Sequence, residues 1–463
     1  MQERACPRID MAMIVRAVDK AFNPVDLHRM NPARYPHLLK STAQGRYDIL
    51  FAFPGASLVL DSNAKLTVPA TVDPSANDFL ATFDIWWGKH RTAVSEEGGT
   101  PFTGGWFVYL GYELVAQIET CLRLPLADKL LPTAVATRFK TAVMVDHETG
   151  MTRIIGEAGQ DETVAAIATD IETLTPAGNS TDIEPTVSSV REAEPQQYLD
   201  AVARIHEYIR EGDVFQVNLS RRWDIHLQDA ATADTLFDRL SVHNPSPFSG
   251  LASWSNAAII SSSPERLVAV HDGVVETRPI AGTRPRSSSL QADVAYSQEL
   301  LAHPKERAEH IMLIDLERND LGRLCVPGTI EVNELMVLES YAHVHHIVSN
   351  VRGRLRENIS PGDVIRAVFP GGTITGCPKV RCMEIIAELE QQARGAYTGS
   401  MGYINRDGSM DLNILIRSMV SSGEHLQLRA GAGIVADSDA LAELDETRTK
   451  ARGLLHAVGL DDA

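Results

Sequence analysis

Hydrophobic positions along this chain recur with two periods, one typical of strands and one typical of helices. Segments of the two kinds do not alternate regularly. Short apolar runs bounded by turn residues predict strands at 46–54 and 104–114. Apolar residues at helical spacing predict one helix over 194–213, ending at Gly212, and another over 305–323. Strands and helices without a regular strand–helix–strand order are typical of an α+β fold rather than of a doubly wound sheet.

One break in composition divides the chain. Residues 174–190 are rich in Thr, Ser, Pro, Gly and Asn, which is typical of a surface linker. We therefore expect an N-terminal region at 1–175, a linker at 176–190 and a denser C-terminal region at 191–460. The two regions are expected to pack as one globular unit.

Net charge narrows the classes of partner. The 463 residues carry a formal net charge of −18, which argues against nucleic acid, since phosphate contacts need a basic face. The same charge argues against an anionic membrane surface, whereas a small anion needs only a local basic pocket. No apolar run approaches the roughly 20 residues that span a bilayer, and the N-terminus lacks the apolar core of a signal peptide. With five scattered cysteines, this predicts a cytoplasmic protein.

A segment near the C-terminus combines glycines with charged residues in a pattern that suits an anionic ligand. Gly431 and Gly433 allow the backbone to approach a ligand and offer N–H donors to a carboxylate. Glu443, Glu446 and Lys450 follow at i, i+3 and i+7, which places them on one face of a helix. The segment is a candidate wall of a binding site.

The predicted helix over 305–323 carries further carboxylates, among them Glu309. A solvated charged face explains any one of them. Two carboxylates from two helices, together with waters and a substrate carboxylate, would suit Mg²⁺. Spacing alone does not separate these two interpretations.

Two other segments carry polar groups of interest. A glycine-rich loop within 367–390 runs into a helix N-terminus, which favours an anion. Its pattern differs from the phosphate-binding GxxxxGK[ST], so a nucleotide site is not predicted. The strand at 341–353 carries His343 and His345 on one face and His346 on the other. Hydrogen-bonded strand histidines are expected there rather than a metal pair.

Seven ordered segments together resemble a known family. They are SSSPERL, TRPIAGTRPR, KERAEHIMLIDLERNDLGR, HVHHIVSNVRG, FPGGTITGCPKVRCMEIIAELE, MDLNILIRS and AGAGIVADS. They are similar to the chorismate-utilizing enzymes, and within these to component I of aminodeoxychorismate synthase and of anthranilate synthase. The resemblance is dense over 190–460 and looser before it. It implies an α+β fold in which two large antiparallel sheets pack face to face with helices outside.

The resemblance also implies a substrate and a cofactor. Chorismate is a small diene dicarboxylate, and its ring carboxylate would lie against Mg²⁺ and the backbone of Gly431 and Gly433. Arg417 and the Tyr397 hydroxyl would hold the other carboxylate, and a guanidinium suits it because the contact is bidentate. The remaining positions that match the family's site are the general acid Glu265, the active-site His346, the metal ligands Glu309 and Glu443 with Glu446 nearby, and the pocket residues Thr283, Thr373, Ala281 and Lys450.

Glu265 has a chemical reason to be an acid. The family's reaction expels the 4-hydroxyl of chorismate, and a carboxylic acid that donates a proton as the C–O bond breaks lowers that barrier. The alternative is a surface ion pair between Glu265 and Arg266. The three arginines of TRPIAGTRPR either contact substrate or only support the charge of the pocket, and both interpretations remain open.

Two positions separate members of the family. Gln216 stands where water-adding members have a lysine base, and glutamine cannot take up a proton at neutral pH. Ammonia needs less activation than water, so Gln216 indicates an amine-adding enzyme. Ala281 stands where many aminodeoxychorismate synthases have a lysine nucleophile (PIKGT), whereas anthranilate synthases have PIAGT. Alanine therefore favours anthranilate synthase or a second variety of aminodeoxychorismate synthase.

Other segments favour aminodeoxychorismate synthase. Three segments are closer to that type: FPGGTITG, HVHHIVS and RYDILFAFP. Anthranilate synthases usually have LLES and RYS segments that form part of the tryptophan feedback site. Here Lys40 replaces the acidic residue of the first segment and Asp48 replaces the serine of the second. The prediction is component I of aminodeoxychorismate synthase, which makes 4-amino-4-deoxychorismate for 4-aminobenzoate and folate, with anthranilate synthase component I as the alternative. No cysteine lies in a glutaminase nucleophile loop, so we expect a separate glutamine amidotransferase subunit to supply ammonia.

Overall fold

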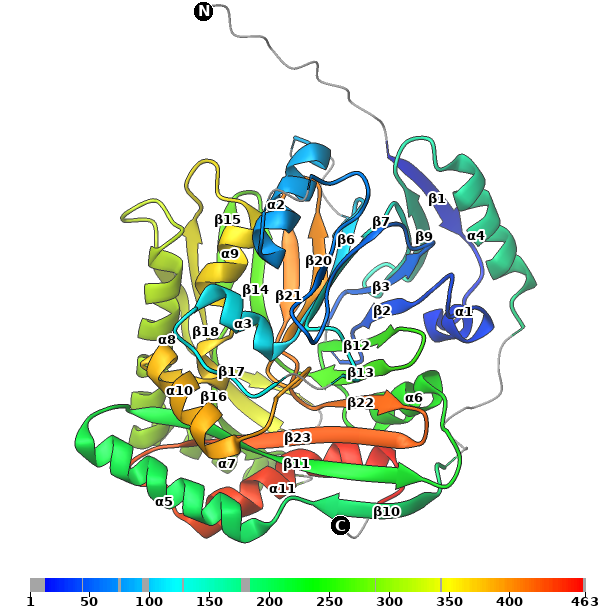
Figure 1. Ribbon diagram of the computed structural model, residues 1–463. Coiled ribbons are helices and arrows are strands. Elements are labelled where there is room, and N and C mark those ends of the chain that lie inside the picture. Colours follow the sequence, from blue (N-terminus) through cyan, green and yellow to red (C-terminus); the bar gives the residue numbers. More distant parts are fainter. Residues whose placement is uncertain are drawn as a thin grey trace, which may run out of the picture.

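Two large antiparallel sheets organise the protein (Figure 1). The computed structural model describes residues 13–43, 45–73, 76–93, 100–126, 129–175, 184–287, 289–341 and 344–460. Within these ranges the first sheet has twelve strands and the second has eleven. The α+β fold expected from the mixed periods is confirmed.

The first sheet mixes strands from the two ends of the chain. Its strands in spatial order are β1 (Ile14–Val18), β9 (Met151–Gly156), β8 (Thr141–Asp146), β3 (Tyr47–Ala52), β2 (His37–Lys40), β12 (Phe248–Ser253), β13 (Ala258–Ser263), β22 (Ser418–Ser422), β23 (His425–Ile434), β11 (Gln216–Leu227) and β10 (Val187–Glu192), with β19 (Gly376–Cys377) paired to β11. The N-terminal and C-terminal regions therefore share one hydrogen-bonded sheet, joined where β2 pairs with β12.

The second sheet has the same mixed origin. Its strands in spatial order are β16 (Ile280–Pro285), β18 (Val344–Arg354), β15 (Val274–Thr277), β14 (Arg266–His271), β21 (Met410–Asn413), β20 (Ser400–Asn405), β6 (Gly105–Leu110), β7 (Ala134–Phe139), β4 (Ser57–Leu60) and β5 (Leu66–Thr67), with β17 (Glu331–Ser340) paired to β18. Here the two regions meet where β6 pairs with β20.

Helices cover the outer faces of the sheets (Figure 1). They are α1 (Pro24–Met30), α2 (Phe79–His90), α3 (Val115–Ile118), α4 (Asp161–Thr173), α5 (Pro195–Glu211), α6 (Ala233–His243), α7 (Leu290–Ala302), α8 (Pro304–Gly322), α9 (Pro361–Val368), α10 (Lys379–Glu390) and α11 (Ala440–Ala457), with short 3₁₀ turns η1 (Tyr112–Leu114) and η3 (Gly372–Ile374). The two helices predicted from periodicity are α5 and α8. Helix α5 is capped at its C-terminus by Gly212, whose φ of +83° is readily adopted by glycine and strained for other residues.

Two of the sequence predictions need correction. The linker at 176–190 is wrong at its end, because residues 187–190 belong to β10 and pair with β11; residues 176–183 lie outside the described part of the chain. As the edge strand beside β11, this polar segment has backbone hydrogen bonds that its composition did not indicate. The strand at 104–114 is β6 only as far as Leu110, after which the chain turns into η1.

An apolar core fills the space between the sheets. Phe51 of β3 and Phe107 of β6 come from different sheets, and their ring centroids lie 5.4 Å apart in an edge-to-face contact. Both side chains are fully buried. Ala396 and Leu415 belong to the same cluster, so the core also anchors the segments that carry the neighbouring Tyr397 and Arg417. The face-to-face packing of the sheets is thereby confirmed.

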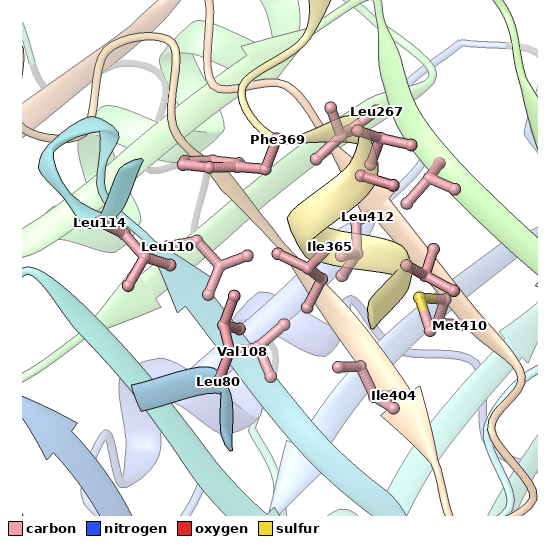
Figure 2. Close-up of a cluster of buried hydrophobic side chains, with 14 of the residues drawn as sticks. Leu80, Val108, Leu110, Leu114, Leu267, Ile365, Phe369, Ile404, Met410 and Leu412 are labelled. Carbon is pink, nitrogen blue, oxygen red and sulfur yellow. The ribbon is translucent and has the colours of Figure 1, made fainter. Parts of the chain in front are cut away.

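A second core lies between the second sheet and the helices α2 and α9 (Figure 2). Leu412 and Ile404 project from adjacent strands, and Ile365 of α9 packs onto them. Leu267 and Phe369 belong to the same cluster, and they lie just beyond Glu265 and just before the glycine-rich loop. This packing therefore holds two segments of the candidate site in place.

Truncation of this second core should reduce stability strongly. Leu412 is fully buried, so Leu412→Ala should lower the free energy of unfolding by about 2–5 kcal/mol, through lost burial and the cavity left behind. Leu126 is 93% exposed, and Leu126→Ala should change stability by less than about 0.5 kcal/mol. Urea denaturation measures both variants. Equal midpoints for the two would contradict the packing described here.

Candidate active site

Glu265 is a buried carboxyl between β13 and β14. Its side chain is only 5% exposed, and the Thr373 hydroxyl donates a hydrogen bond of 2.6 Å to Oε1. Its backbone is fixed as well, because the amide of Ile414 donates to its carbonyl. Burial raises the pKa of Glu265 to about 8. The carboxyl therefore keeps its proton at neutral pH, as a general acid must.

The alternative of an ion pair between Glu265 and Arg266 is wrong. Arg266 turns to the other side of β14 and pairs with Asp411 and Glu276, at 2.9 and 3.2 Å. Alternate residues of a strand point to opposite sides, and the turn before β14 sends Glu265 inward.

A second buried acid, Glu317 of α8, lies near Glu265 and was not predicted. It is 6% exposed, and burial followed by the charge of Asp320 raises its pKa. Its own charge in turn raises the pKa of Glu265, although less than burial does. The sequence contained a signal for it, because Glu309, Glu317 and Asp320 recur at i, i+8 and i+11 along one face of the helix. Asp320 itself is paired with Lys379 at 2.5 Å.

His346 and Thr283 face each other across β18 and β16. They are register partners, and His346 Nδ1 lies 3.0 Å from the Thr283 hydroxyl. Burial first, and then the charge of Arg417, lower the pKa of His346 to about 4. The imidazole is therefore neutral at pH 7. Ala281, two residues before Thr283, pairs with Ile347 in the same ladder.

The arginines of TRPIAGTRPR all form ion pairs. Each guanidinium is paired with carboxylates of neighbouring elements: Arg278 with Glu334 and Glu339, Arg284 with Glu299 and Glu306, and Arg286 with Asp293. These ion pairs favour a supporting role over substrate contact for the three arginines. A Cβ at Gly282 would lie 2.6 Å from Glu306 Oε2, so glycine is needed where these pairs crowd the strand.

The strand histidines are hydrogen-bonded as expected. His345 is buried between Ser340 and Asp293, with Nδ1 at 2.8 Å from the Ser340 hydroxyl and Nε2 at 3.1 Å from the Asp293 carboxylate. His343 lies outside the described residues. The sequence-based preference for hydrogen-bonded histidines therefore holds for the part that the structure describes.

Arg417 is a half-buried guanidinium that lacks a carboxylate partner. Among the described residues, none with a carboxylate forms an ion pair with it. Its φ is +52°, a left-handed value that costs a non-glycine residue energy and is often found at functional sites. Burial lowers its pKa, and Tyr397 and Glu446 counter this. An unpaired cation of this kind is suited to an anionic ligand.

Tyr397 and Gly431 lie on the same wall as Arg417. Tyr397 is 7% exposed, and burial raises its pKa to about 12, so the phenol stays protonated and can donate. A Cβ at position 431 would lie 2.7 Å from the Tyr397 hydroxyl. Glycine is therefore required for the close approach of β23 to this tyrosine.

Helix α11 presents its charged face beside Gly431. Lys450 Nζ donates to the carbonyl of Gly431 at 3.0 Å and pairs with Glu446 at 2.6 Å. One turn earlier, the Ser438 hydroxyl donates to Glu443 Oε1 at 2.6 Å. The predicted i, i+3, i+7 face is confirmed, and its lysine is bound to the glycine segment.

The three predicted metal ligands do not form one closed cluster. Glu443 and Glu446 share a face of α11, whereas Glu309 comes from α8. Within the described ranges, no three His, Cys, Asp or Glu side chains gather closely enough to hold a metal ion by themselves. Carboxylate oxygens are nevertheless the donors Mg²⁺ prefers, and Mg²⁺ normally keeps several waters and uses one or two protein carboxylates with the substrate. The donor set fits an ion completed by substrate and water.

Gln216 begins β11, which pairs with the strand β23 that carries Gly431 and Gly433. It is 9% exposed, and a Cβ at Gly433 would lie 2.3 Å from its Nε2. Asn218, two residues further on the same strand, was not predicted; its Oδ1 lies 3.0 Å from the Cβ position of residue 431. The two amides and the two glycines thus face one another.

A separate cavity of about 280 Å³ lies at the joint between the N-terminal and C-terminal regions. Lys40, Tyr47 and Phe248 line it. Asp48 is instead buried behind it and pairs with His147 at 2.9 Å. Lys40 and Asp48, the two departures from the anthranilate synthase segments, therefore lie at or just behind this cavity. No helix of the described chain is long and apolar enough to cross a membrane.

Comparison with known proteins identifies the family. The model of the chorismate binding enzyme family matches residues 36–456. An anthranilate synthase component I-like protein of Synechocystis is 41% identical over 361 residues, which cover 77% of this chain and 73% of that protein. Aminodeoxychorismate synthase component 1 of Bacillus subtilis is 38% identical over 435 residues, which cover 92% of each.

A solved structure agrees with this assignment. Anthranilate synthase component I from Streptococcus pneumoniae has a TM-score of 0.77 and 30% identity, and the match covers 89% of this chain and 92% of that one. The family match spans both regions of the chain and every site residue named above. This chain belongs to the chorismate-binding enzyme family and is a chorismate-utilizing enzyme close to anthranilate synthase component I.

Proposed function

We propose that this protein is component I of an aminodeoxychorismate synthase, which converts chorismate and ammonia to 4-amino-4-deoxychorismate. The observation that carries an amine-adding reaction is Gln216, a buried amide at the position where water-adding relatives have a lysine base. Neutral ammonia is a stronger nucleophile than neutral water and needs no such base. A separate glutamine amidotransferase subunit would supply it.

We assign different residues of the described chain to substrate binding, proton donation and positioning in this reaction. Arg417 and the Tyr397 hydroxyl bind one carboxylate of chorismate, since the guanidinium has no carboxylate partner among the described residues. Glu265, protonated below about pH 8, donates its proton to the departing 4-hydroxyl, which leaves as water. Thr373 donates to Oε1 of Glu265 and so holds the carboxyl in one orientation. Neutral His346 fixes the Thr283 side of the pocket.

The proposed cofactor is Mg²⁺, with Glu309 and Glu443 as its protein ligands. When bound, the ion would neutralise the second carboxylate of chorismate. The chain contributes carboxyl oxygens from two helices for this purpose, and Lys450 pairs with the neighbouring Glu446.

Removal of either proposed ligand should weaken the Mg²⁺-dependent part of substrate binding. Glu309→Gln or Glu443→Gln should raise the Kd for chorismate in the presence of Mg²⁺ about tenfold or more, since loss of a charged contact costs about 1.5–3 kcal/mol. Calorimetric titration with and without Mg²⁺ measures this separately from turnover. Glu331 lies in an exposed pair with Arg352, and Glu331→Gln is the control. Full activity in excess chelator would refute the proposal.

A second candidate, anthranilate synthase component I, is favoured by one observation. Ala281 leaves no lysine at the position of the nucleophile in many aminodeoxychorismate synthases, so ammonia must add to the ring directly. That first step is shared by both products. Elimination of pyruvate from the ring aminated at carbon 2 gives anthranilate. 4-Amino-4-deoxychorismate instead requires a second ammonia to add at carbon 4 as the first amine leaves, with pyruvate retained.

Product identity decides between the two candidates. We expect purified protein with chorismate, Mg²⁺ and ammonium to give 4-amino-4-deoxychorismate by mass spectrometry, and 4-aminobenzoate once a separate lyase is added. Intact-mass analysis during turnover should show no covalent adduct. Anthranilate with pyruvate as the main product would establish the second candidate. Isochorismate would overturn both candidates together with the interpretation of Gln216.

A further inference from the structure

Two neighbouring side chains of β11 carry buried acceptor oxygens without a donor in the described part of the chain. Gln216 Oε1 and Asn218 Oδ1 have no hydrogen-bond partner among the described residues, although the two residues are only 9% and 8% exposed. Residues at i and i+2 of a strand point to the same side. Buried polar atoms in folded proteins are nearly always paired, so two unpaired oxygens on one side of one strand indicate room for a bound molecule.

The backbone that carries these oxygens is held rigidly. The Asn218 amide donates to the carbonyl of Thr375 at 2.9 Å, and its carbonyl accepts from Arg394 Nη2 at 2.7 Å. The carbonyl of Gln216 accepts from the Cys382 thiol at 3.0 Å. Because both residues are fixed from neighbouring elements, the unpaired oxygens belong to a preformed surface.

That surface is part of the candidate active site. Asn218 Oδ1 and the Tyr397 hydroxyl lie 3.0 and 2.7 Å from the position that a Cβ of residue 431 would occupy. Lys450, whose charge acts on Glu265, binds the carbonyl of Gly431. The glycine therefore leaves open the space between the Asn218 oxygen, the tyrosine that we propose binds chorismate, and the side of the cleft with the acid.

The chemistry of this surface matches ammonia. Ammonia has three N–H donors and a single lone pair, and the lone pair must remain available to attack the ring. A binding site for ammonia must therefore offer hydrogen-bond acceptors rather than donors. The two neutral amide oxygens act only as acceptors. A lysine ammonium in the place of Gln216 would offer only donors and would occupy the ammonia lone pair.

We propose that Asn218 and Gln216 together form the binding seat for the ammonia nucleophile, with each amide oxygen accepting one of its N–H groups. The seat holds the nitrogen on the glycine side of the cleft with its lone pair turned toward the substrate ring. This proposal rests on the proposed aminating function and deepens it by assigning Asn218 a direct contact with the nitrogen.

The test separates the two co-substrates of the reaction. Asn218→Ala should raise the KM for ammonium about 3- to 10-fold, the loss expected for one neutral hydrogen bond, while the KM for chorismate changes less than twofold. The fraction of chorismate converted to a hydroxylated product in place of the amine should increase. Ammonium chloride is titrated at saturating chorismate and Mg²⁺, with products measured by mass spectrometry.

A matched control distinguishes this role from a structural one. Asn413 is also buried, but its oxygen accepts from the Met401 amide and its nitrogen donates to the Phe248 carbonyl. Asn413→Ala should lower the melting temperature without changing the KM for ammonium. If Asn218→Ala is insoluble, Gln216→Ala carries the same expectation, because it removes the other oxygen of the seat.

Each outcome bears on one proposal. If wild-type protein makes no aminated product, the proposed function fails and this inference fails with it. If wild-type protein aminates chorismate but Asn218→Ala leaves the KM for ammonium unchanged, or raises that for chorismate instead, only the seat is overturned.

Discussion

Replacement of Glu265 by glutamine should lower kcat by about 10²–10⁴-fold and leave the affinity for chorismate within a few-fold. Glutamine keeps the shape of the side chain and can still accept from Thr373, which donates to Oε1 in the wild-type protein. It has no proton that can be transferred to the departing hydroxyl. Single-turnover kinetics and equilibrium binding of chorismate separate the chemical step from binding.

The same residue should set the alkaline limb of the pH profile. Burial raises the pKa of Glu265 to about 8, so the acid form that donates is present below this pH and is lost above it. In the wild-type protein kcat should fall as pH rises through about 8. The limb should be absent from the residual activity of Glu265→Gln, and a limb that persists would show that it belongs to another group.

Near-normal kcat in Glu265→Gln would mean that another group supplies the proton. His346 would be a poor replacement, because its pKa of about 4 leaves no imidazolium at neutral pH. Glu317 would be the next candidate, since it is buried on α8 with a raised pKa and acts electrostatically on Glu265. The variant Glu317→Gln would then be measured in the same assay.

Removal of the charge of Arg417 should reduce kcat/KM for chorismate by a factor of about 30 to several thousand. Loss of one partner from a buried, charged contact costs about 2–5 kcal/mol, and each 1.4 kcal/mol is a factor of ten. Arg417→Met tests this directly. Arg417→Lys keeps the charge but loses the planar fork, and should still lose about tenfold or more.

The backbone of Arg417 allows activity to be separated from stability. The backbone φ of +52° at position 417 costs less conformational energy for glycine than for arginine. Arg417→Gly should therefore melt at the same temperature as the wild type or higher, yet lose as much kcat/KM as Arg417→Met. Parallel thermal denaturation and kinetics measure both effects. A stable Arg417→Gly variant with unchanged kcat/KM would show that this arginine does not bind the substrate.

The sequence by itself determined the local elements and the identity of the family. Helix α5 could be predicted because its apolar spacing and Gly212 lie within one continuous segment. The face of Glu443, Glu446 and Lys450 on α11 could be predicted for the same reason, since helical geometry relates residues a few positions apart. Motif order identified the family because each motif is a short run of residues.

Only the tertiary structure decided which charged groups are satisfied and which are available. Arg278 and Arg417 are both arginines on strand-flanking segments, but carboxylates from β17 neutralise the first and none of the described residues pairs with the second. The pKa of Glu265 likewise depends on distant elements, because burial raises it and the hydrogen bond from Thr373, 108 residues away, partly lowers it.

The same reason explains what sequence analysis missed. Glu317, Asn218 and the strand β10 owe their roles to partners distant in the chain, such as Arg394, which holds Asn218 across 176 residues. Periodicity and turn chemistry describe conformation over roughly one element. Burial, which sets pKa values and leaves two amide oxygens without a partner, is a property of packed elements, and it exists only once both sheets have formed.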